Sequence, residues 1–301
     1  MALIDNTTYT GKDTAGFYST ALIKGTSKEM FTMVPNVKSK VKMAKMDLGN
    51  IIQADSCTFS ASGDATLAQK DLEVCDLKVN LELCTKDFEV NYLSETLRAG
   101  SNNNEIPTEF QAYFLEQVAL KISEQLENTV WLGNPDGSPV VGVCQGLLEL
   151  FGADGTVIDL AASPASVTAA SIMSEVGRVY AAIPKAVKQS KRATIFMSIE
   201  DGSLYRQALV AANPALIAYN GNSFNLSYIE TPIVEVAGLP AGTMVACDPK
   251  NLWYGTDLVS DENSIKILDM SNTTGDETVR FITHFKFGVN YGVGAEIVYF
   301  R

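Results

Sequence analysis

Apolar and polar residues alternate in two separated segments of the first third of the chain. Residues 37–46 (VKSKVKMAKM) alternate lysine with valine and methionine, and residues 75–83 (CDLKVNLEL) place cysteine, leucine and valine at every second position. A period of two is typical of a strand with one buried face. With the polar stretch 53–66 between them, these segments predict a long two-stranded hairpin. Such a ribbon is only marginally stable alone, so we expect it to lie on another surface.

The period changes to that of an α-helix between Ile106 and Trp131. The apolar stripe consists of Phe110, Phe114, Val118, Ile122, Leu126 and Val130, and charged residues lie off it. Pro107 suits a first helical turn, and a Gly-Asn-Pro sequence at 133–135 ends the run. At 1.5 Å per residue, the pattern predicts a helix about 35 Å long.

The second half of the chain alternates between the two periods, which indicates an α+β fold. Helices are expected over 167–187 and 199–212, and strands over 193–197, 231–236, 243–247 and 264–268. The alternating residues 280–292 predict a long late strand, followed by a final strand over 295–300. Residues 1–36 are polar without periodicity, so we expect an extended arm that gains its order from neighbouring molecules.

Composition supports a folded chain and argues against direct nucleic-acid binding. Of the 301 residues, 46% are hydrophobic and 19% are charged, a globular balance. The net charge is −12, with no dense cluster of lysine and arginine. Proteins that bind nucleic acid tightly normally carry a basic patch.

Cysteines and termini suggest an intracellular origin. The five cysteines (Cys57, Cys75, Cys84, Cys144 and Cys247) form no CxxC pair, so we expect reduced, partly buried thiols. The first residues lack the character of a signal peptide, and no apolar run reaches the roughly 18 residues of a membrane span. We therefore expect a protein of cytoplasmic origin with no membrane partner.

Candidate catalytic residues are isolated from the partners they would need. His284 is the one histidine, and it lies in an alternating strand without a neighbouring carboxylate. Cys144 has no nearby base to activate it, which favours a buried thiol. The glycines of 133–137 are not followed by Gly-Lys-Ser/Thr, so this segment predicts a turn and not a phosphate loop.

Two acidic clusters complete the candidate chemistry. Asp71, Glu73 and Asp76 are expected on a solvated hairpin face, and Asp257, Asp261 and Glu262 in a solvated loop. Neither has the ligand number and spacing of a calcium site. The sequence thus predicts no catalytic residue, no cofactor, no metal and no enzymatic activity.

The segment 238–258 (GLPAGTMVACDPKNLWYGTDL) carries the most specific family resemblance. A turn at Leu239-Pro240-Ala241-Gly242 precedes a short strand, and Trp253-Tyr254-Gly255 follows before the long late strand. Together with the order of arm, hairpin, long helix and α/β region, this segment resembles the major capsid proteins of tailed bacteriophages, with the Hong Kong 97-type fold. The resemblance covers most of residues 37–301 and rests on architecture and loose motifs.

The resemblance implies a division of the chain into regions. These are an N-terminal arm reaching over a neighbour (1–36), an extended loop (37–85), a peripheral domain with the spine helix (86–145), an axial domain (146–275), and a return strand with a final axial strand (276–301). In this family the subunit assembles into pentamers and hexamers of an icosahedral shell around double-stranded DNA, so the implied location is the virion after assembly in the cytoplasm of the host bacterium.

The resemblance also implies partners and leaves two alternatives. Expected partners are other copies of the chain, a separate scaffolding protein, a portal, decoration or head-tail connector proteins, and weak non-specific contact with packaged DNA. The family's lysine–asparagine cross-link is not expected, since no motif ties Lys45 or Lys70 to Asn290. The alternatives are an encapsulin-like shell around a cargo enzyme and a mixed α/β enzyme.

Overall fold

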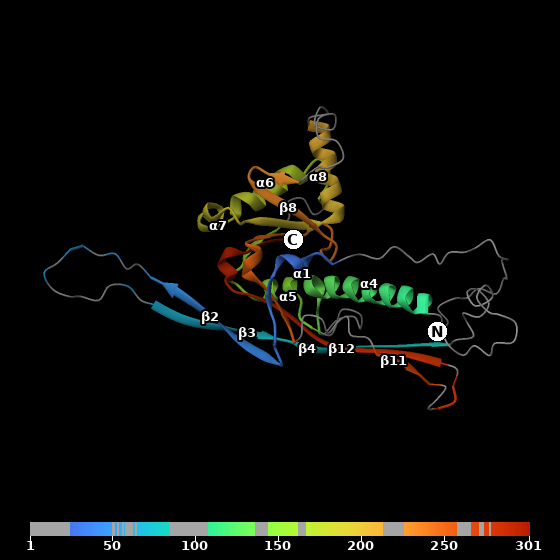
Figure 1. Ribbon diagram of the computed structural model, residues 1–301. Helices are drawn as coiled ribbons and strands as arrows, with labels where there is room; N and C mark the ends of the chain where they lie inside the picture. Colours follow the sequence, from blue (N-terminus) through green and yellow to red (C-terminus); the bar gives the residue numbers. More distant parts are fainter. Residues whose placement is uncertain are drawn as a thin grey trace.

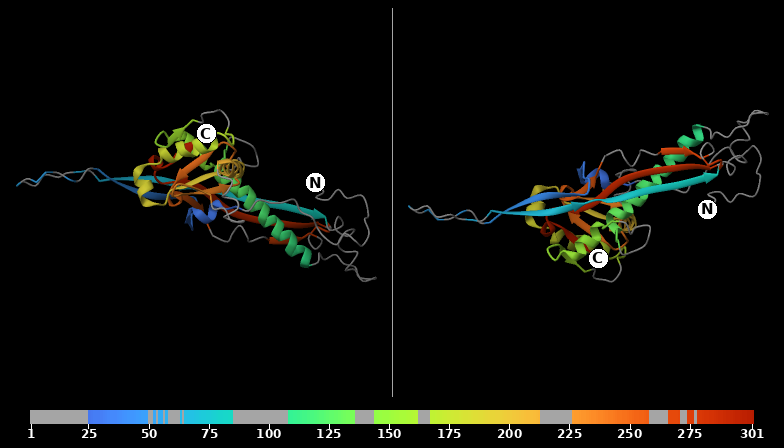
Figure 2. Two further views of the ribbon diagram at one scale, coloured as in Figure 1. Left: turned by 90° about the horizontal axis from the view of Figure 1, so that it is seen from above. Right: turned by 90° about the horizontal axis from the view of Figure 1, so that it is seen from below.

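The computed structural model describes residues 25–49, 65–84, 108–135, 144–161, 167–212, 226–257, 266–270, 274–276 and 278–301, with single residues 52, 54, 55, 57 and 63. An upper body of helices and strands stands over a long lower layer, and a ribbon projects to one side (Figure 1). Figure 2 shows that the ribbon and the lower layer extend the molecule in opposite directions. The lower layer contains α4 (Thr108–Leu132), β4 (Cys75–Cys84), β11 (Lys266–Asp269) and β12 (Thr278–Tyr291), and the ribbon is β2 (Lys40–Leu48) with β3 (Ala65–Glu73).

Helix α4 lies against a five-stranded sheet in the lower layer. The predicted stripe is confirmed where side chains are described: Val118, Ile122, Leu126 and Val130 are all buried. They share a core with Phe285 and Phe287 of β12 and with the inward residues of β4. Full burial of such a side chain contributes about 1.5–3 kcal/mol, so this contact stabilises the long helix that propensity alone would leave marginal.

Strand β12 organises the five-stranded sheet. The sheet runs in the order β1 (Thr32–Val34), β10 (Leu252–Thr256), β12 and β11, and β4 also pairs with β12. The β4 ladder is antiparallel over ten residue pairs, from Cys84 opposite Thr278 to Cys75 opposite Phe287. The predicted late strand 280–292 is therefore confirmed as the longest strand of this sheet.

The predicted pairing of the hairpin is wrong. Strand β2 pairs with β3, with Lys40 opposite Glu73 and Leu48 opposite Ala65, and the alternating segment 75–83 belongs to β4 in the body. The alternation in β4 arises because its inner face packs on the core beneath α4. Strand β3 was hidden because its sequence, ATLAQKDLE, is mostly polar and does not alternate.

The upper body is a six-stranded sheet with helices on one face. Ile195 and Met197 point toward α6 and α8, whereas Phe196 between them points to the core shared with α4. This alternation lets one sheet serve two cores. The strand order is β5 (Ile158–Leu160), β13 (Val298–Phe300), β9 (Met244–Cys247), β6 (Thr194–Ser198), β8 (Thr231–Val236), β7 (Ser227–Tyr228).

Most predicted elements of the upper body are confirmed, with two corrections. Helix α8 (Ile199–Ala212) begins as expected at Ser198, whose Oγ accepts the Asp201 amide at 3.0 Å. The predicted helix 167–187 is two helices, α6 (Ile172–Ala182) and α7 (Lys185–Ser190), because Pro184 interrupts the run. The final strand is shorter than expected, since residues 294–296 form a 3₁₀ turn. The lower layer adds α5 (Leu147–Ala153) and a 3₁₀ turn at Pro249–Asn251.

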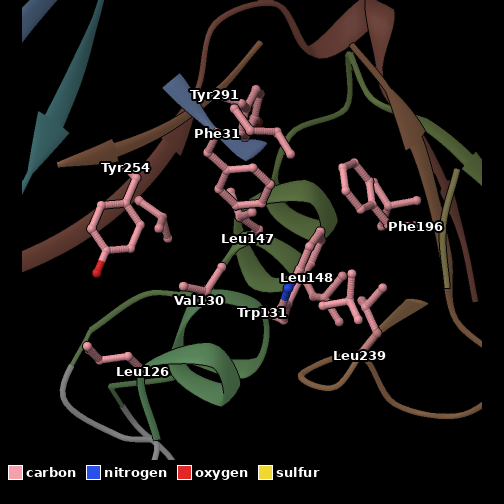
Figure 3. Close-up of a cluster of buried hydrophobic side chains, with 14 of the residues drawn as sticks. Phe31, Leu126, Val130, Trp131, Leu147, Leu148, Phe196, Leu239, Tyr254 and Tyr291 are labelled. Carbon is pink, nitrogen blue, oxygen red and sulfur yellow. The ribbon is translucent and has the colours of Figure 1, made fainter. Parts of the chain in front are cut away.

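An aromatic cluster joins the upper and lower parts (Figure 3). The fully buried Trp131 ring lies 5.8 Å from Phe31 and 5.6 Å from Phe196, between ring centroids. Gly238, at the start of the patterned 238–258 segment, packs directly on Trp131 and on the Glu127 carbonyl, where a Cβ atom would overlap both. The end of α4 thus meets the upper sheet at one closely packed point.

The first described residues are fixed to their own chain. Glu127 of α4 accepts the Ser27 hydroxyl at 2.6 Å and the Ser27 amide at 3.1 Å, and Trp131 Nε1 donates to Ser27 Oγ at 2.8 Å. Helix α1 (Ser27–Met30) and β1 are therefore part of the body, unlike the expected arm over 1–36. Residues 1–24 of that expected arm lie outside the described residues.

The buried Glu127 gives the fold a pH dependence. Burial raises the pKa of this carboxyl, and the titratable groups near it are Tyr254 and Lys28. A carboxyl whose folded pKa is raised stabilises the fold fully below its unfolded pKa, and this contribution is lost as pH rises through the folded pKa. We expect Glu127→Gln to gain stability relative to the unchanged chain as pH rises from about 4.5 to 8.

Urea unfolding of the unassembled chain at several pH values measures this difference. Glu116→Gln, at an exposed position of the same helix, serves as the matched control and should show no such trend. If the difference in unfolding free energy between Glu127→Gln and the unchanged chain stays constant with pH, the raised pKa of Glu127 is contradicted.

Candidate assembly interface

The projecting ribbon has two unlike faces. Residues directly opposite in β2 and β3 share a face, so one face carries the pairs Lys40/Glu73, Lys42/Asp71, Ala44/Gln69 and Met46/Leu67. Charged pairs lie near the body and an apolar pair lies far from it. The other face carries Val41, Met43 and Leu72, which are partly or fully covered.

The apolar pair on the open face is strongly exposed. Met46 is 64% exposed and Leu67 is 76% exposed, although both belong to regular strands. The two side chains lie directly opposite each other, so they form one small apolar surface on the protruding ribbon. In the described part of the chain, β2 and β3 form a separate two-stranded sheet, so the far part of the ribbon has no further strand to support it.

Several contacts fasten β3 where the ribbon meets the body, a region of residues 36–39 and 70–74 that we call the ribbon root. Leu72 is 0% exposed and packs on Gly255 of β10, where a Cβ atom would lie 3.0 Å from Leu72 Cδ2. The Glu73 carbonyl crosses so close to Gly288 of β12 that no larger residue fits there. Asn290 Nδ2 donates to the Asp71 carbonyl at 2.6 Å.

A charged group next to this crossing adds an electrostatic contact. The Lys70 ammonium lies 3.1 Å from the centroid of the Tyr291 ring and 3.6 Å from Asp154 Oδ2. Tyr291 donates its hydroxyl to the same carboxylate at 2.6 Å, and this bond holds the pKa of Asp154 far below its usual range. Burial lowers the pKa of Lys70, against the opposing effect of Asp154.

The β2 side of the ribbon root is held mainly through its backbone. The Asn36 and Val37 amides donate to the Asp257 and Thr256 carbonyls at 2.9 and 3.1 Å. Lys286 Nζ donates to the Lys38 carbonyl at 2.6 Å, while the Lys38 side chain pairs with Asp257 at 2.8 Å. Both strands of the ribbon are therefore fixed where they leave the body.

The catalytic candidates named from sequence remain apart in the structure. His284 is exposed on β12 opposite Lys78, as expected for a surface histidine. Gly133 follows the end of α4 as part of a turn, and residues 136 and 137 of the glycine-containing segment lie outside the described residues. The described part of the chain therefore brings no catalytic group to either position.

The acidic candidates serve as ion-pair partners. Asp71 and Glu73 flank Lys40 at 3.0 and 3.8 Å, and Asp76 pairs with Lys286 at 3.2 Å. Asp261 and Glu262 lie outside the described residues. Within the described ranges, no group of three or more histidine, cysteine, aspartate or glutamate side chains is arranged to hold a metal ion.

The prediction of reduced thiols is wrong for two of the five cysteines. Cys75 and Cys144 are joined by a disulfide in the structure, with their Cα atoms 6.0 Å apart. Cys57, Cys84 and Cys247 are free, and burial raises the pKa of Cys247 far above its usual range. The pairing was not visible in the sequence because the partners are 69 residues apart and follow no recognised spacing.

The residue types of the family cross-link are engaged inside the chain. Lys70 is held by Tyr291 and Asp154, and the Asn290 side chain binds the Asp71 carbonyl and the Tyr291 amide. These contacts use Lys70 and Asn290 for the ribbon root. The absence of a cross-link stays a prediction.

Neither a ligand pocket nor a membrane helix is found in the described residues. A cavity of about 150 Å³ beside Glu127, between α4 and Tyr254, is smaller than the roughly 300 Å³ of an ordinary small-molecule site. None of the described helices combines the length and apolar character needed to cross a membrane.

Comparisons of the whole fold give clear matches among solved structures. The capsid of an empty GTA particle matches with a TM-score of 0.60 at 13% identity, over 97% of this chain and 94% of that chain. A chain of Mycobacterium phage Che8 gives 0.60 at 11% identity over 99% and 98%, and one of Gordonia phage Cozz gives 0.62 at 11% over 97% and 91%. No family model matches the sequence, and no curated protein sequence does.

These matches define the class of fold. The chain has the α+β fold of phage capsid proteins, and the agreement extends over nearly its whole length. At identities of 11–13% the likeness concerns the fold. The subdomain boundaries expected from the sequence stay a prediction.

The crossing at Gly288 predicts a position that tolerates no side chain. We expect Gly288→Ala to destabilise the chain by roughly 1–3 kcal/mol, because the new methyl group displaces the Glu73 carbonyl from β12. Urea unfolding gives the free energy, and limited proteolysis reports loosening of the ribbon. Gly155→Ala is the control, since a Cβ atom there meets nothing within 4 Å. If Gly288→Ala and Gly155→Ala lower the free energy of unfolding equally, the close contact between Gly288 and the Glu73 carbonyl is contradicted.

Proposed function

We propose that this protein is the structural subunit of an icosahedral phage head, in which copies assemble into pentamers and hexamers around double-stranded DNA. The observation that carries the proposal is the agreement in fold with the capsid of the GTA particle over 97% of this chain and 94% of that chain. The isolated histidine, the small cavity and the free-standing ribbon fit a protein that works through contacts with its own copies and not through catalysis.

The ribbon supplies the main contact between copies in this proposal. The ribbon root fixes both strands to the body. The ribbon projects away from the body (Figure 1), so its exposed Met46/Leu67 pair is available to a neighbouring copy in the proposed ring of subunits. One such contact is weak. In a closed ring every subunit gives and receives a ribbon, so the contacts act together and the assembly becomes stable through multivalency.

The proposed regions follow the expected division of the chain. The lower layer with α4 is the proposed peripheral domain, and the upper sheet with α6 and α8 is the proposed axial domain at the centre of pentamers and hexamers. Helix α5 and strands β10 and β11 fall in the range 146–275 expected for the axial domain but lie in the lower layer. The net charge of −12 suits a shell wall that repels packaged DNA and so does not bind it. A separate scaffolding protein, a portal and head-tail connector proteins complete the expected set of partners in the host cytoplasm and in the virion.

The two alternatives have weaker support. An encapsulin-like shell shares the fold class, but the matched structures named above come from phages and a GTA particle. An enzyme needs a converging polar site, and the described residues bring none together. Genes for a portal and a terminase beside this gene would indicate a phage head. A gene for a cargo enzyme in that place would indicate an encapsulin-like shell.

Electron microscopy of the purified chain tests the proposal directly. Size-exclusion chromatography and negative staining at several protein and salt concentrations should show closed shells or rings of five or six subunits. A compact monomer under every condition, even with a candidate scaffolding protein added, would overturn the proposal.

The exposed Met46/Leu67 pair gives a sharper prediction. We expect Met46→Glu with Leu67→Glu to abolish rings and shells, because burying each apolar side chain contributes up to about 1.5–3 kcal/mol and a buried charge reverses that gain. Met46→Leu keeps the apolar volume and should assemble normally. Circular dichroism must show the same folded monomer in both variants. Assembly by the double glutamate variant would contradict the role of this pair.

A further inference from the structure

The Cys75–Cys144 disulfide lies at a mechanically important point. Cys75 is the first residue of β4, and only Val74 separates it from β3 of the ribbon. Cys144 precedes α5 and shares the core beneath α4. The bond therefore runs from the residue that follows the ribbon root to the connection between α4 and α5, beside Phe287 of β12.

The Cys144 side of the bond is itself firmly packed. Cys144 is 2% exposed. The Gly146 amide, two residues later, donates to the Gly133 carbonyl at the end of α4 at 2.6 Å. The Leu150 amide donates to the Gly146 carbonyl at 3.2 Å and continues this packing into α5. A pull on Cys144 is thus resisted by α4 and α5 together.

A pulled ribbon would first lose the contacts of the ribbon root and would then reach Cys75, at the end of the β4 ladder. The β4 ladder to β12 ends at the Cys75/Phe287 pair, and Val74 is held by a hydrogen bond from its amide to the Ser39 carbonyl at 3.0 Å. Hydrogen bonds at the end of a ladder open one after another when the strand is peeled from its end. A covalent bond at the last pair blocks this route.

We propose that Cys75 and Cys144 form an oxidation-dependent clamp, which is open in a reducing cytosol and closes on oxidation to fix the ribbon root to the helical core. Cytosolic thiol pools keep most protein cysteines reduced, whereas disulfides persist outside the cell. The clamp itself concerns the single chain. Its use, to carry load from a neighbour on the ribbon, rests on the proposed shell function.

The closing reaction is thiol–disulfide exchange with a small disulfide oxidant such as oxidised glutathione. The Cys75 thiolate attacks the oxidant, which releases one thiol and leaves a mixed disulfide on Cys75. The Cys144 thiolate then attacks Cys75 Sγ and releases the second thiol. In total two S–H bonds break, one protein S–S bond forms, and two protons and two electrons pass to the oxidant. Cys75 reacts first because it is only partly buried, whereas Cys144 is enclosed.

The other cysteines are poorly placed to compete. Cys84 lies nine residues further along β4, about 30 Å away at the rise of a strand. Cys247 is fully buried in β9 of the upper sheet, opposite Thr194. Cys57 is exposed in the segment beyond the ribbon strands. One intramolecular pair is therefore expected.

Alkylation and peptide mapping test the clamp on the unassembled full chain. After equilibration with oxidised or reduced glutathione, the protein is denatured in iodoacetamide and digested. We expect a linked Cys75–Cys144 peptide and alkylated Cys57, Cys84 and Cys247 after oxidation, and five alkylated cysteines after reduction. Five alkylated cysteines under both conditions, or a different linked pair, would overturn the proposal.

Thermal unfolding measures the effect of the bond. Closing a loop of this length should raise Tm by roughly 5–10 °C in the oxidised chain. In Cys75→Ala and Cys144→Ala, oxidation should not raise Tm. The unchanged chain in its reduced form should have a Tm similar to theirs. Cys84→Ala, in the same strand, is the control that keeps the rise. A Tm that does not respond to oxidation would contradict the clamp.

Assembled shells test whether the disulfide helps a subunit to resist removal from the shell. Oxidised shells of Cys75→Ala should release subunits at a lower denaturant concentration than oxidised shells of Cys84→Ala. Equal resistance would overturn that role. If no shells form from any variant, the proposed function fails, while the peptide map and Tm still decide whether the clamp exists.

Discussion

The arrangement of the fold depends on the packing of Trp131, at the end of helix α4, against the upper sheet. Trp131 has no exposed surface, and its ring contacts Phe31 from the start of the chain and Phe196 from β6. Its indole nitrogen donates to Ser27, which in turn donates to Glu127 one turn earlier in α4. Three segments far apart in the sequence are thus fixed by one side chain, which combines a large apolar area with a single satisfied polar group. A second aromatic contact, from Phe151 of α5 to Tyr291 of β12 and Tyr299 of β13, joins the same two parts.

The sequence predicted best those elements whose pattern is produced by local burial. The stripe of α4 and the alternation of β4 and β12 are visible because each element has one face on the core and one outside. Strand β6 and helix α8 were also predicted to within a residue. Strand β6 is buried on both faces, so its signal was a short apolar run and not an alternation. The helix over 167–187 was overextended because Pro184 lies among residues that otherwise continue a helical pattern.

The ribbon and its root could not be predicted in the same way. Strand β3 is exposed on both faces over much of its length, so it has no alternation to detect. Leu72 is an isolated apolar residue among charged ones, and its buried site is created by Gly255, which is distant in sequence. The Cys75–Cys144 pair also joins segments that only the fold brings together. In each case the decisive partner is remote, and one sequence without its fold does not indicate which remote residue it is.

The contrast between the ribbon root and the exposed Met46/Leu67 pair explains how a weak contact could be sufficient for the proposed assembly. Ordering a free backbone costs roughly 1–2 kcal/mol per residue, and β2 and β3 contain nine residues each. If the ribbon were ordered only on meeting a neighbour, two exposed apolar side chains could not offset that cost. Hydrogen bonds, the Lys70 contacts and the buried Leu72 order the ribbon root within the single chain, so the neighbour receives a largely preorganised strand pair. The free energy from Met46 and Leu67 then remains available for association, against the mutual repulsion of subunits that each carry a net charge of −12.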